Sequence, residues 1–260
     1  MAWTHPSYRT RYLPALTASA IAALPKKARA LVIVPTGAIE QHGPHLPVGG
    51  DAVMGQAWLN AALPLLPAEA PVYVAPPITL GKSNEHVGYP GTLIVQKQTL
   101  RRLLLAIIDQ CWRWGFRRFG ILNTHGGNSA VIVETLRELQ GQREAIRVQM
   151  LSSGWYPPVS KQETVYGFHA GEVETAWVMA VAPEQVDASV LPCEFAGDVE
   201  DPAKLRAEFA PATYSWVTSD ISNSGVMGDA SQATPEKGRE WLARGAEGLA
   251  ANILRFLNEE

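Results

Sequence analysis

The chain reads LVIVPTGAIEQHGPHLPVGGD from Leu31 to Asp51, and this stretch decides the fold. Its first part, Leu31–Pro35, is an unbroken apolar run, which is typical of a strand buried on both faces of a sheet. The turn-rich remainder carries carboxylate and imidazole groups directly after that strand. We therefore expect the end of a buried strand to deliver oxygen and nitrogen donors into a cleft.

Three more short apolar runs predict buried strands, and helical patterns separate them. These runs are Val72–Ala75, Phe119–Asn123 and Arg147–Leu151. The alternation of strands and helices predicts an α/β fold whose mainly parallel sheet is covered by helices on both faces. We expect residues 1–260 to form a single domain, because we find neither an internal repeat nor a separating linker.

Residues that favour helix termini predict several element boundaries. Asn128 is expected to cap a helix, and Gly141 is expected to lie just past the end of that helix. Thr234 is expected to cap the final helix. In an earlier helix that starts near Leu100, Cys111 lies on the apolar face, so we expect its thiol to be buried.

Composition argues against several classes of function. The 22 basic and 25 acidic residues give a formal charge of −3, which leaves no basic footprint for nucleic acid. No stretch approaches the roughly 20 apolar residues that cross a bilayer, so we expect no membrane partner. The two cysteines cannot form a disulfide framework, and we expect a reducing, cytoplasmic location.

The first candidate metal ligands follow the run Leu31–Pro35. Glu40 and His42 are two residues apart, so an extended backbone directs both at one ion or at two neighbouring ions. Asp51 begins a helical segment, where a carboxylate is favoured electrostatically. Alone, Asp51 would be interpreted as a plain helix cap, but beside Glu40 and His42 a ligand role is favoured.

Five of the six histidines fall in short motif stretches: His42, His45, His86, His125 and His169. His125 follows a predicted strand, and Gly126 and Gly127 allow the backbone to approach a ligand closely. We expect His125 to bind metal and Gly126 to line the substrate pocket. A turn histidine bonded to the backbone is the alternative for His125. We expect His45 to orient a ligand rather than to bind an ion.

Spacing alone leaves open which acid accompanies His169. If the helix already includes His169, Glu172 shares its face and Glu174 does not. If His169 lies in the preceding loop, that argument lapses, and one of the acids is a first-turn glutamate that complements the helix dipole.

Two further segments supply candidate substrate-binding residues. Glu85 and His86 lie in a loop that we expect to shape the pocket or to join subunits. Trp155 and Tyr156 follow the fourth predicted strand and are expected to form an aromatic wall, with plain packing as the alternative.

The candidate ligands mix carboxylates with imidazoles and lack thiolate, which suits two divalent ions, with Zn²⁺ preferred over Mn²⁺ or Fe²⁺. Two ions about 3.5 Å apart can hold a bridging hydroxide and polarise a carbonyl group. The sequence therefore predicts hydrolysis of an amide-like bond.

Taken together, the motifs resemble those of the creatininase (creatinine amidohydrolase) family over most of the chain. The stretches that carry the resemblance are Gly37–Pro47, Asp51, Glu85-His86, Pro90–Leu93, Asn123–Asn128, His169–Gly171, Glu174-Thr175 and Ser224–Asp229. The resemblance implies a three-layer αβα fold, a two-metal site and often a hexamer.

The resemblance also implies which residues hold the ions. Glu40, Asp51 and His125 would hold one ion, and His42, Asp51 and a glutamate would hold the other, with Asp51 bridging. The family pattern His-x-Gly-x-x-Glu-Thr favours Glu174 as that glutamate.

The same resemblance makes His169 the catalytic histidine, and Glu172 remains a second catalytic candidate. The chain departs from true creatininases at Gly126-Gly127, where those enzymes resemble one another in having Tyr-Glu, a pocket tyrosine and a metal ligand. The expected tryptophan lid before His169 is replaced by Val165 and Tyr166. Creatinine is therefore disfavoured as the substrate.

We therefore expect a metal-dependent amidohydrolase that cleaves a C–N bond of a cyclic amide, a formamide or a small peptide-like substrate. A lactonase or phosphoester hydrolase on the same ions is one alternative, and a non-catalytic oligomeric binding protein is another. The expected partners are a small-molecule substrate and further copies of the chain in a homohexamer.

Overall fold

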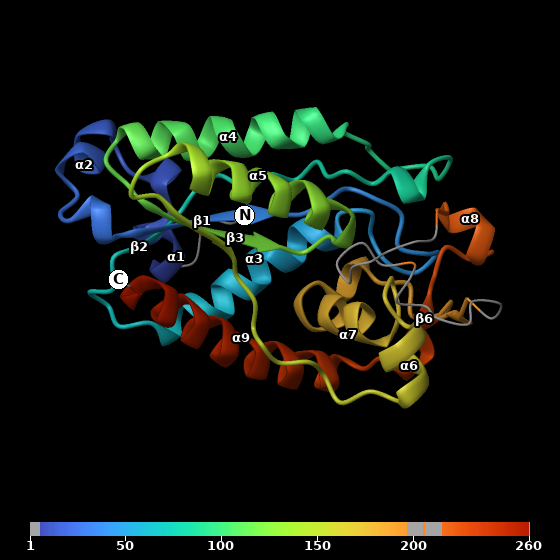
Figure 1. Ribbon diagram of the computed structural model, residues 1–260. Coiled ribbons are helices and arrows are strands. Elements are labelled where there is room, and N and C mark those ends of the chain that lie inside the picture. The colour runs from blue at the N-terminus through green and yellow to red at the C-terminus, as the bar shows by residue number, and fades with distance from the viewer. Residues whose placement is uncertain (1–5, 197–204, 206–214, 260) are drawn as a thin grey trace.

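The computed structural model describes residues 6–196, 205 and 215–259 and is centred on a parallel sheet (Figure 1). The sheet has the strand order β2-β1-β3-β4. Its strands are β1 (Leu31–Thr36), β2 (Val72–Val74), β3 (Arg118–Asn123) and β4 (Arg147–Met150). The predicted strands and their parallel arrangement are thereby confirmed. A short antiparallel pair lies apart from this sheet and consists of β5 (Cys193–Glu194) and β6 (Gly228–Asp229).

Helices cover both faces of the sheet, as the three-layer prediction requires. α4 (Lys97–Arg113) and α5 (Ser129–Gln142) lie over one face, and α3 (Gly50–Ala62) and α9 (Pro235–Asn258) lie over the other (Figure 1). The shorter helices are α1 (Pro6–Arg11), α2 (Ala18–Ala23), α6 (Lys161–Tyr166), α7 (Glu172–Val181) and α8 (Thr218–Ile221). α7 packs beside α9, past the carboxyl ends of the strands (Figure 1).

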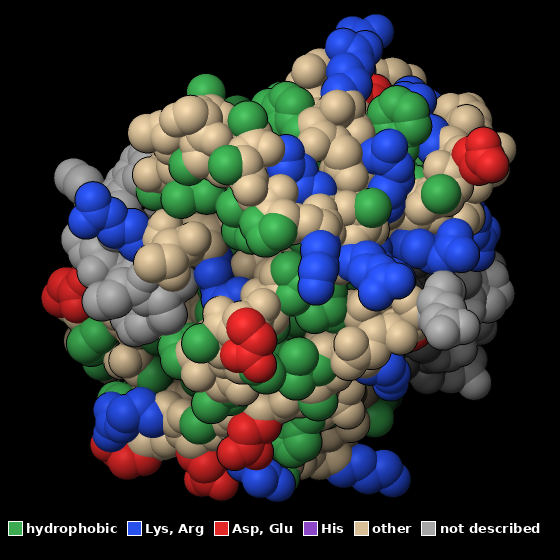
Figure 2. Space-filling view, turned by 90° about the vertical axis from the view of Figure 1, so that its left-hand side faces the viewer, with side chains coloured by type: hydrophobic (Ala, Val, Ile, Leu, Met, Phe, Trp, Pro, Cys, Tyr) green, Lys and Arg blue, Asp and Glu red, His purple; other side chains and the backbone are tan. Residues whose placement is uncertain are grey.

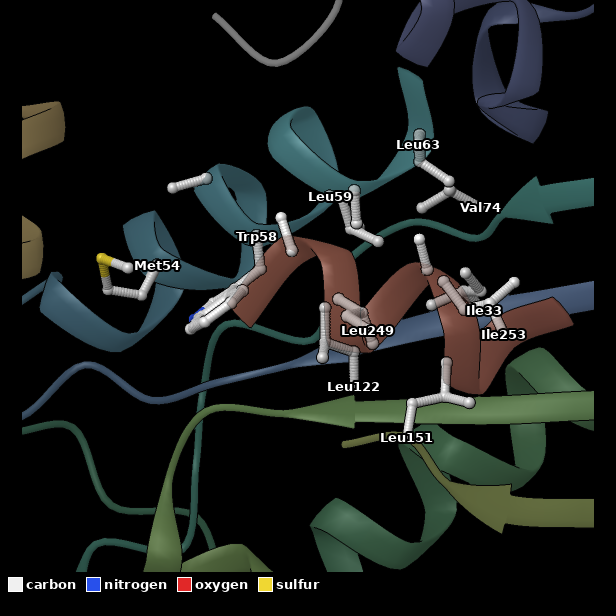
Figure 3. Packing of buried hydrophobic residues seen from close by; sticks show 14 of the residues in the cluster. Ile33, Met54, Trp58, Leu59, Leu63, Val74, Leu122, Leu151, Leu249 and Ile253 are labelled. Atoms are coloured by element: carbon white, nitrogen blue, oxygen red, sulfur yellow. The ribbon is translucent and has the colours of Figure 1, made fainter. Parts of the chain in front are cut away.

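The core explains why the strands read as continuous apolar runs. β1 is buried along its whole length because both of its faces are covered. Ile33 and Leu122 of the sheet face Leu249 and Ile253 of α9 (Figure 3). On the other face, Ile108 of α4 is fully buried. Truncating a residue such as Ile253 to Ala would cost about 2–5 kcal/mol of stability.

Helix capping follows the prediction at the last helix. The side chain of Thr234 accepts a hydrogen bond from the backbone N–H of Lys237 at 3.2 Å, at the start of α9. Cys111 is 3% exposed, as expected, and burial raises the pKa of its thiol to about 12.

Asn128 occupies the position before α5, as predicted, but the capping expected of its side chain and the predicted end of the helix are wrong. The side chain of Asn128 accepts from Lys82 N at 2.9 Å and donates to Gly37 O at 3.0 Å, and does not cap the helix. This arrangement satisfies two buried backbone groups and ties together two loops. Gly141 lies inside α5, which continues to Gln142.

The end of the molecule at which the strands begin faces the viewer in Figure 2. Lys and Arg side chains spread over the middle and upper part of this face, and acidic side chains lie mostly near its lower edge. No helix among the described residues is long and apolar enough to cross a membrane.

Candidate metal centre

Four chain segments converge beyond the carboxyl ends of β1 and β3. Glu40 and His42 lie in the loop after β1, and His125 follows β3. Asp51 lies in the first turn of α3, and Glu174 lies in the first turn of α7. The parallel order of the sheet brings these distant positions together, because neighbouring parallel strands end at the same edge.

Glu40, Asp51 and His125 form a buried group whose nearest donor atoms all lie within 4.8 Å of one another. His125 Nδ1 is 3.1 Å from Glu40 Oε1 and 3.5 Å from Asp51 Oδ2. The opposite ring nitrogen of His125 donates to the carbonyl of Lys82 at 3.2 Å. That bond leaves the lone pair of Nδ1 directed at the two acids.

His42 stands on the other side of Asp51. Its Nε2 is 3.6 Å from Asp51 Oδ1 and 4.0 Å from Glu174 Oε2. Its Nδ1 donates to the backbone carbonyl of Glu40 at 3.0 Å, so the lone pair of Nε2 faces the acids. Among the described residues, His42, Glu174 and His169 also form a group that could share an ion.

The donor set fits divalent cations. Glu40 Oε2 and Asp51 Oδ2 are buried and have no hydrogen-bond partner. A buried carboxylate oxygen without a partner costs stability, whereas coordination of a cation would satisfy it. Carboxylate and imidazole donors suit Zn²⁺, Mn²⁺ and Fe²⁺.

The field of the acids is strong enough to change the titration of the imidazoles. Burial lowers the pKa of His42, but the hydrogen bond and charge of Asp51 outweigh it and raise that pKa to about 10. Burial likewise opposes the charge of Glu40, which raises the pKa of His125 to about 10. Burial, followed by the charge of Glu40, raises the pKa of Asp51. The same field attracts metal cations.

His169 differs from His42 and His125, because its pKa is lowered and not raised. Burial, and then the charges of His42 and His86, hold its pKa well below the usual range of a histidine. Its Nε2 donates to the backbone carbonyl of Gln41 at 2.8 Å, and its Nδ1 lies 3.7 Å from Glu40 Oε1. The ring is therefore a neutral imidazole with a free acceptor nitrogen directed at the cluster.

Gln41 is a buried residue to which the sequence assigned no separate role. Its Nε2 donates to His86 Nδ1 at 2.8 Å, so the proton of the His86 ring lies on Nε2, which is 3.4 Å from Glu40 Oε1. His86 thus orients the Glu40 carboxylate, in addition to lining a cavity. The position of Gln41 between two candidate ligands was the signal that could have identified it.

The start of α7 separates the two acids that spacing left open. His169 lies in the loop before the helix, so the shared-face argument for Glu172 does not apply. Glu172 is buried and pairs with Lys237 at 2.6 Å, outside the cation-binding groups of the described residues. Its predicted catalytic role is corrected to a structural ion pair. Glu174 Oε2 faces His42 instead.

His45 does not contact a candidate ligand directly. Its Nε2 donates to Thr175 Oγ1 at 2.8 Å, next to Glu174 in the first turn of α7. His45 is therefore bonded to the first turn of the helix that carries Glu174, and its predicted orienting role stays a prediction.

Two cavities meet at the cluster, and both are lined by His125 and Gly126. The first has a volume of about 400 Å³ and a largely apolar wall, formed by Met54, Trp58, Leu122, Met150, Trp177 and Leu249. The second has a volume of about 330 Å³ and includes Lys82, Glu85, His86, Phe168, His169 and Trp216. Gly126 thus lines both cavities, and Glu85 and His86 line the second.

The aromatic wall comes from other residues than predicted. Trp155 packs against the hydrophobic cluster around Trp241, and Tyr156 is 53% exposed. Neither lines the two cavities, so the prediction is wrong for both. Trp58 and Trp177 line the first cavity instead, with ring centroids 5.2 Å apart. Their helical spacing is that of ordinary core residues, so no separate signal in the sequence identifies them.

Gly127 accounts for the departure from the creatininase motif. A Cβ atom at this position would lie 2.2 Å from Glu85 Oε1 and 2.5 Å from His125 Nε2. The space that a side chain would need is therefore filled by the Glu85 carboxylate. Glu85 Oε1 lies 3.5 Å from His125 Nε2, on the side of the ring away from Asp51.

The family model described as creatinine amidohydrolase matches residues 14–253. The chain belongs to the creatininase family. Its relatives include the mycofactocin precursor peptide peptidase of Mycolicibacterium smegmatis, which is 31% identical over 87% of this chain and 85% of that protein. The creatinine amidohydrolase of Pseudomonas putida is 29% identical over 86% of this chain and 88% of that protein.

Solved structures agree with this membership. A crystal structure of creatininase is 25% identical, with a TM-score of 0.76 over 96% of this chain and 99% of that chain. A creatininase variant complexed with creatine is 26% identical, with the same TM-score of 0.76, and covers 96% and 99% of the two chains. The predicted family, the fold and the enzyme class, a metal-dependent hydrolase of C–N bonds, are thereby confirmed.

Proposed function

We propose that this creatininase-family chain is a two-metal amidohydrolase that cleaves a C–N bond in a cyclic amide, a formamide or a small peptide-like substrate. The observation that carries the proposal is the buried cluster of acids and imidazoles, with orphaned carboxylate oxygens, at the meeting point of two cavities. The names of the relatives, a precursor-peptide peptidase and a creatinine amidohydrolase, support amide chemistry.

Five side chains are the proposed ligands. Glu40, Asp51 and His125 would hold one ion, and His42 and Glu174 would hold the other, with Asp51 shared between them. Zn²⁺ is the proposed ion, and Mn²⁺ or Fe²⁺ suits the same donors. Solved creatininases described as Zn-Zn type and as Mn support this choice. When bound, the ions activate water for attack and polarise the substrate carbonyl.

His169 moves the proton in this proposal. Its Nε2 is held as a donor by the Gln41 carbonyl at 2.8 Å, so proton transfer takes place at Nδ1 alone. The low pKa keeps Nδ1 unprotonated at neutral pH. Nδ1 therefore accepts a proton from the attacking water and then donates it to the leaving nitrogen.

The test is a substrate screen on protein that has been stripped with chelator and reloaded with Zn²⁺, read by mass spectrometry. We expect turnover of lactams, formamides or peptide amides to follow the bound metal. His125→Ala should lose metal occupancy and turnover together, because it removes the imidazole donor from the buried group of Glu40, Asp51 and His125.

Two outcomes would contradict the proposal. Full activity of His125→Ala protein after treatment with chelator would show that the reaction does not need the metal. Fast turnover of lactones or phosphoesters without any amide turnover would show that the protein is a lactonase or phosphoester hydrolase with the same metal site.

A further inference from the structure

Lys82 is a basic residue at the second cavity whose charge is not compensated by any described residue. It lines that cavity and is partly buried. Within the described part of the chain, no ion pair or hydrogen bond involves its ammonium group. A partly buried ammonium without a counter-ion favours binding of an anion, because ion pairing strengthens as water is excluded.

The backbone of Lys82 is anchored directly behind a candidate ligand. Its N–H donates to Asn128 Oδ1 at 2.9 Å, and its carbonyl accepts from His125 Nε2 at 3.2 Å. The absent side chain of Gly127 permits this approach, because a Cβ there would lie 2.5 Å from the Lys82 carbonyl oxygen. The backbone of Lys82 is thereby fixed next to the cluster.

The acids that line the second cavity face imidazoles and not Lys82. Glu85 lies 3.5 Å from His125, and Glu40 lies between His125 and His86, at 3.1 and 3.4 Å. Neither acid forms an ion pair with Lys82. Among the described residues, no acid therefore compensates Lys82, and its charge is open to an anion on a bound molecule.

The two cavities divide the substrate at its scissile bond. His169 lines the second cavity and not the first. Because His169 is the proposed proton donor to the leaving nitrogen, the amine half of the substrate enters the second cavity. The acyl half then lies in the first cavity, where Trp58, Trp177 and Met54 form an apolar wall.

We infer that Lys82 binds a carboxylate on the amine half of the substrate, while the first cavity holds an apolar acyl group. The substrate class is an N-acyl amino acid. Hydrolysis breaks the acyl C–N bond, adds the hydroxyl of water to the acyl carbon and places the proton on the released amine. The inference rests on the proposed function.

The test compares N-benzoylglycine with N-benzoylglycinamide on Zn²⁺-loaded protein. The two compounds differ only in the terminal carboxylate. We expect the acid to have a KM about tenfold lower than the carboxamide, the size of one charge-assisted contact. Lys82→Met should abolish this preference, so that the two KM values become equal within about twofold.

Lys26→Met is the matched control, because Lys26 is exposed near the start of the chain's first strand and outside both cavities. This variant should keep the preference. Equal KM values for acid and carboxamide in the unchanged protein would overturn the inference. A preference that survives in Lys82→Met would overturn it as well.

Failure of the hydrolase proposal gives a different result. If neither compound is cleaved, equilibrium binding of N-benzoylglycine still tests the subsite. Binding of N-benzoylglycine about tenfold weaker in Lys82→Met would support the carboxylate-binding role of Lys82 while the hydrolase proposal is rejected. Equal binding by both proteins would reject the subsite.

Discussion

Two buried carboxylate centres in this molecule differ in how their oxygens are satisfied. Glu163 accepts the backbone N–H groups of Glu172 and Asp229 at 2.8 and 2.9 Å. In contrast, Glu40 Oε2 and Asp51 Oδ2 are buried without a hydrogen-bond partner. The oxygens of the Glu163 centre are satisfied within the chain, whereas the Glu40 centre keeps oxygens that a cation could satisfy.

Glycines make room for the Glu163 centre. A Cβ at Gly167 or Gly171 would lie 2.3 Å from an atom of the Glu163 carboxylate, and one at Gly228 would lie 2.9 Å from it. The carboxylate thus joins α6, the start of α7 and β6. The comparison teaches that a buried acid with paired oxygens supports the fold, and that one with orphaned oxygens is a candidate ligand site.

The largest expected effect comes from Glu40→Gln. The amide lacks the negative charge and places an NH₂ group among the donors, so we expect Zn²⁺ occupancy and amide turnover to be lost. Folding should be retained, because the substitution removes a buried charge without removing volume. Bound metal is measured by elemental analysis, and the thermal midpoint by circular dichroism. Full Zn²⁺ occupancy in Glu40→Gln would contradict the distinction between the two centres.

Glu163→Gln is the matched substitution at the other centre, with the opposite expected result. An amide NH₂ group would face a backbone N–H donor, so we expect a stability loss of about 1–3 kcal/mol. Metal content per folded molecule should not change. The free energy of unfolding in urea and the metal content check this. If Glu163→Gln loses metal without losing stability, the distinction between a structural Glu163 centre and a metal-binding Glu40 centre is wrong.

The comparison also explains what the sequence could predict. Glu40, His42 and His125 stand out because they follow apolar strands in short motifs, and parallel strands bring such motifs to one edge. Glu163 has no such signal, because its partners are backbone N–H groups of distant segments. Only the folded chain reveals that it is satisfied.

The errors in the prediction have the same origin. Asn128 was assigned to a helix cap by a local rule, yet its amide bonds to the backbone of Lys82 and Gly37. Glu172 has a suitable spacing from His169, yet Lys237 of the last helix pairs with it. In each case a long-range partner outweighed the local preference.

The next effect in size is the pH dependence of metal binding. The pKa of His42 and of His125 is about 10, so both imidazoles carry a proton at neutral pH before a metal binds. Ligation must release these two protons. The apparent Zn²⁺ affinity should therefore rise by up to about 100-fold per pH unit between pH 6 and 8. Calorimetric titration in buffers of different ionisation enthalpy counts the released protons.

The stability of the metal-free protein changes with pH in the opposite direction to the Zn²⁺ affinity. Both pKa values are raised above the unfolded value of 6.5. The folded state then binds more protons than the unfolded state, so this stability is complete below pH 6.5 and is lost as the pH rises through about 10. Zn²⁺ affinity that does not change with pH would contradict the charged state assigned to the two imidazoles.

The smallest expected effect extends the comparison from acids to indoles. Trp177 Nε1 and Trp112 Nε1 are both buried without a hydrogen-bond partner, but only Trp177 lines the first cavity. The Trp112 ring is instead packed against Arg117 and Arg143. If an orphaned donor in a cavity marks a ligand site, Trp177→Phe should raise the KM for N-benzoylglycinamide about 3–10-fold, the size of one neutral hydrogen bond.

Trp112→Phe is the control for this substitution, and it should leave that KM unchanged, because its orphaned donor lies outside the cavities. In Trp177→Phe the removal of an unpaired buried N–H costs no hydrogen bond, so any fall in the thermal midpoint reflects only the lost packing of the indole. Equal KM values for the two variants would mean that an orphaned donor carries no information about substrate in this protein. The distinction between satisfied and orphaned groups would then hold only for the carboxylates, where a full charge makes an unpaired buried atom far more costly.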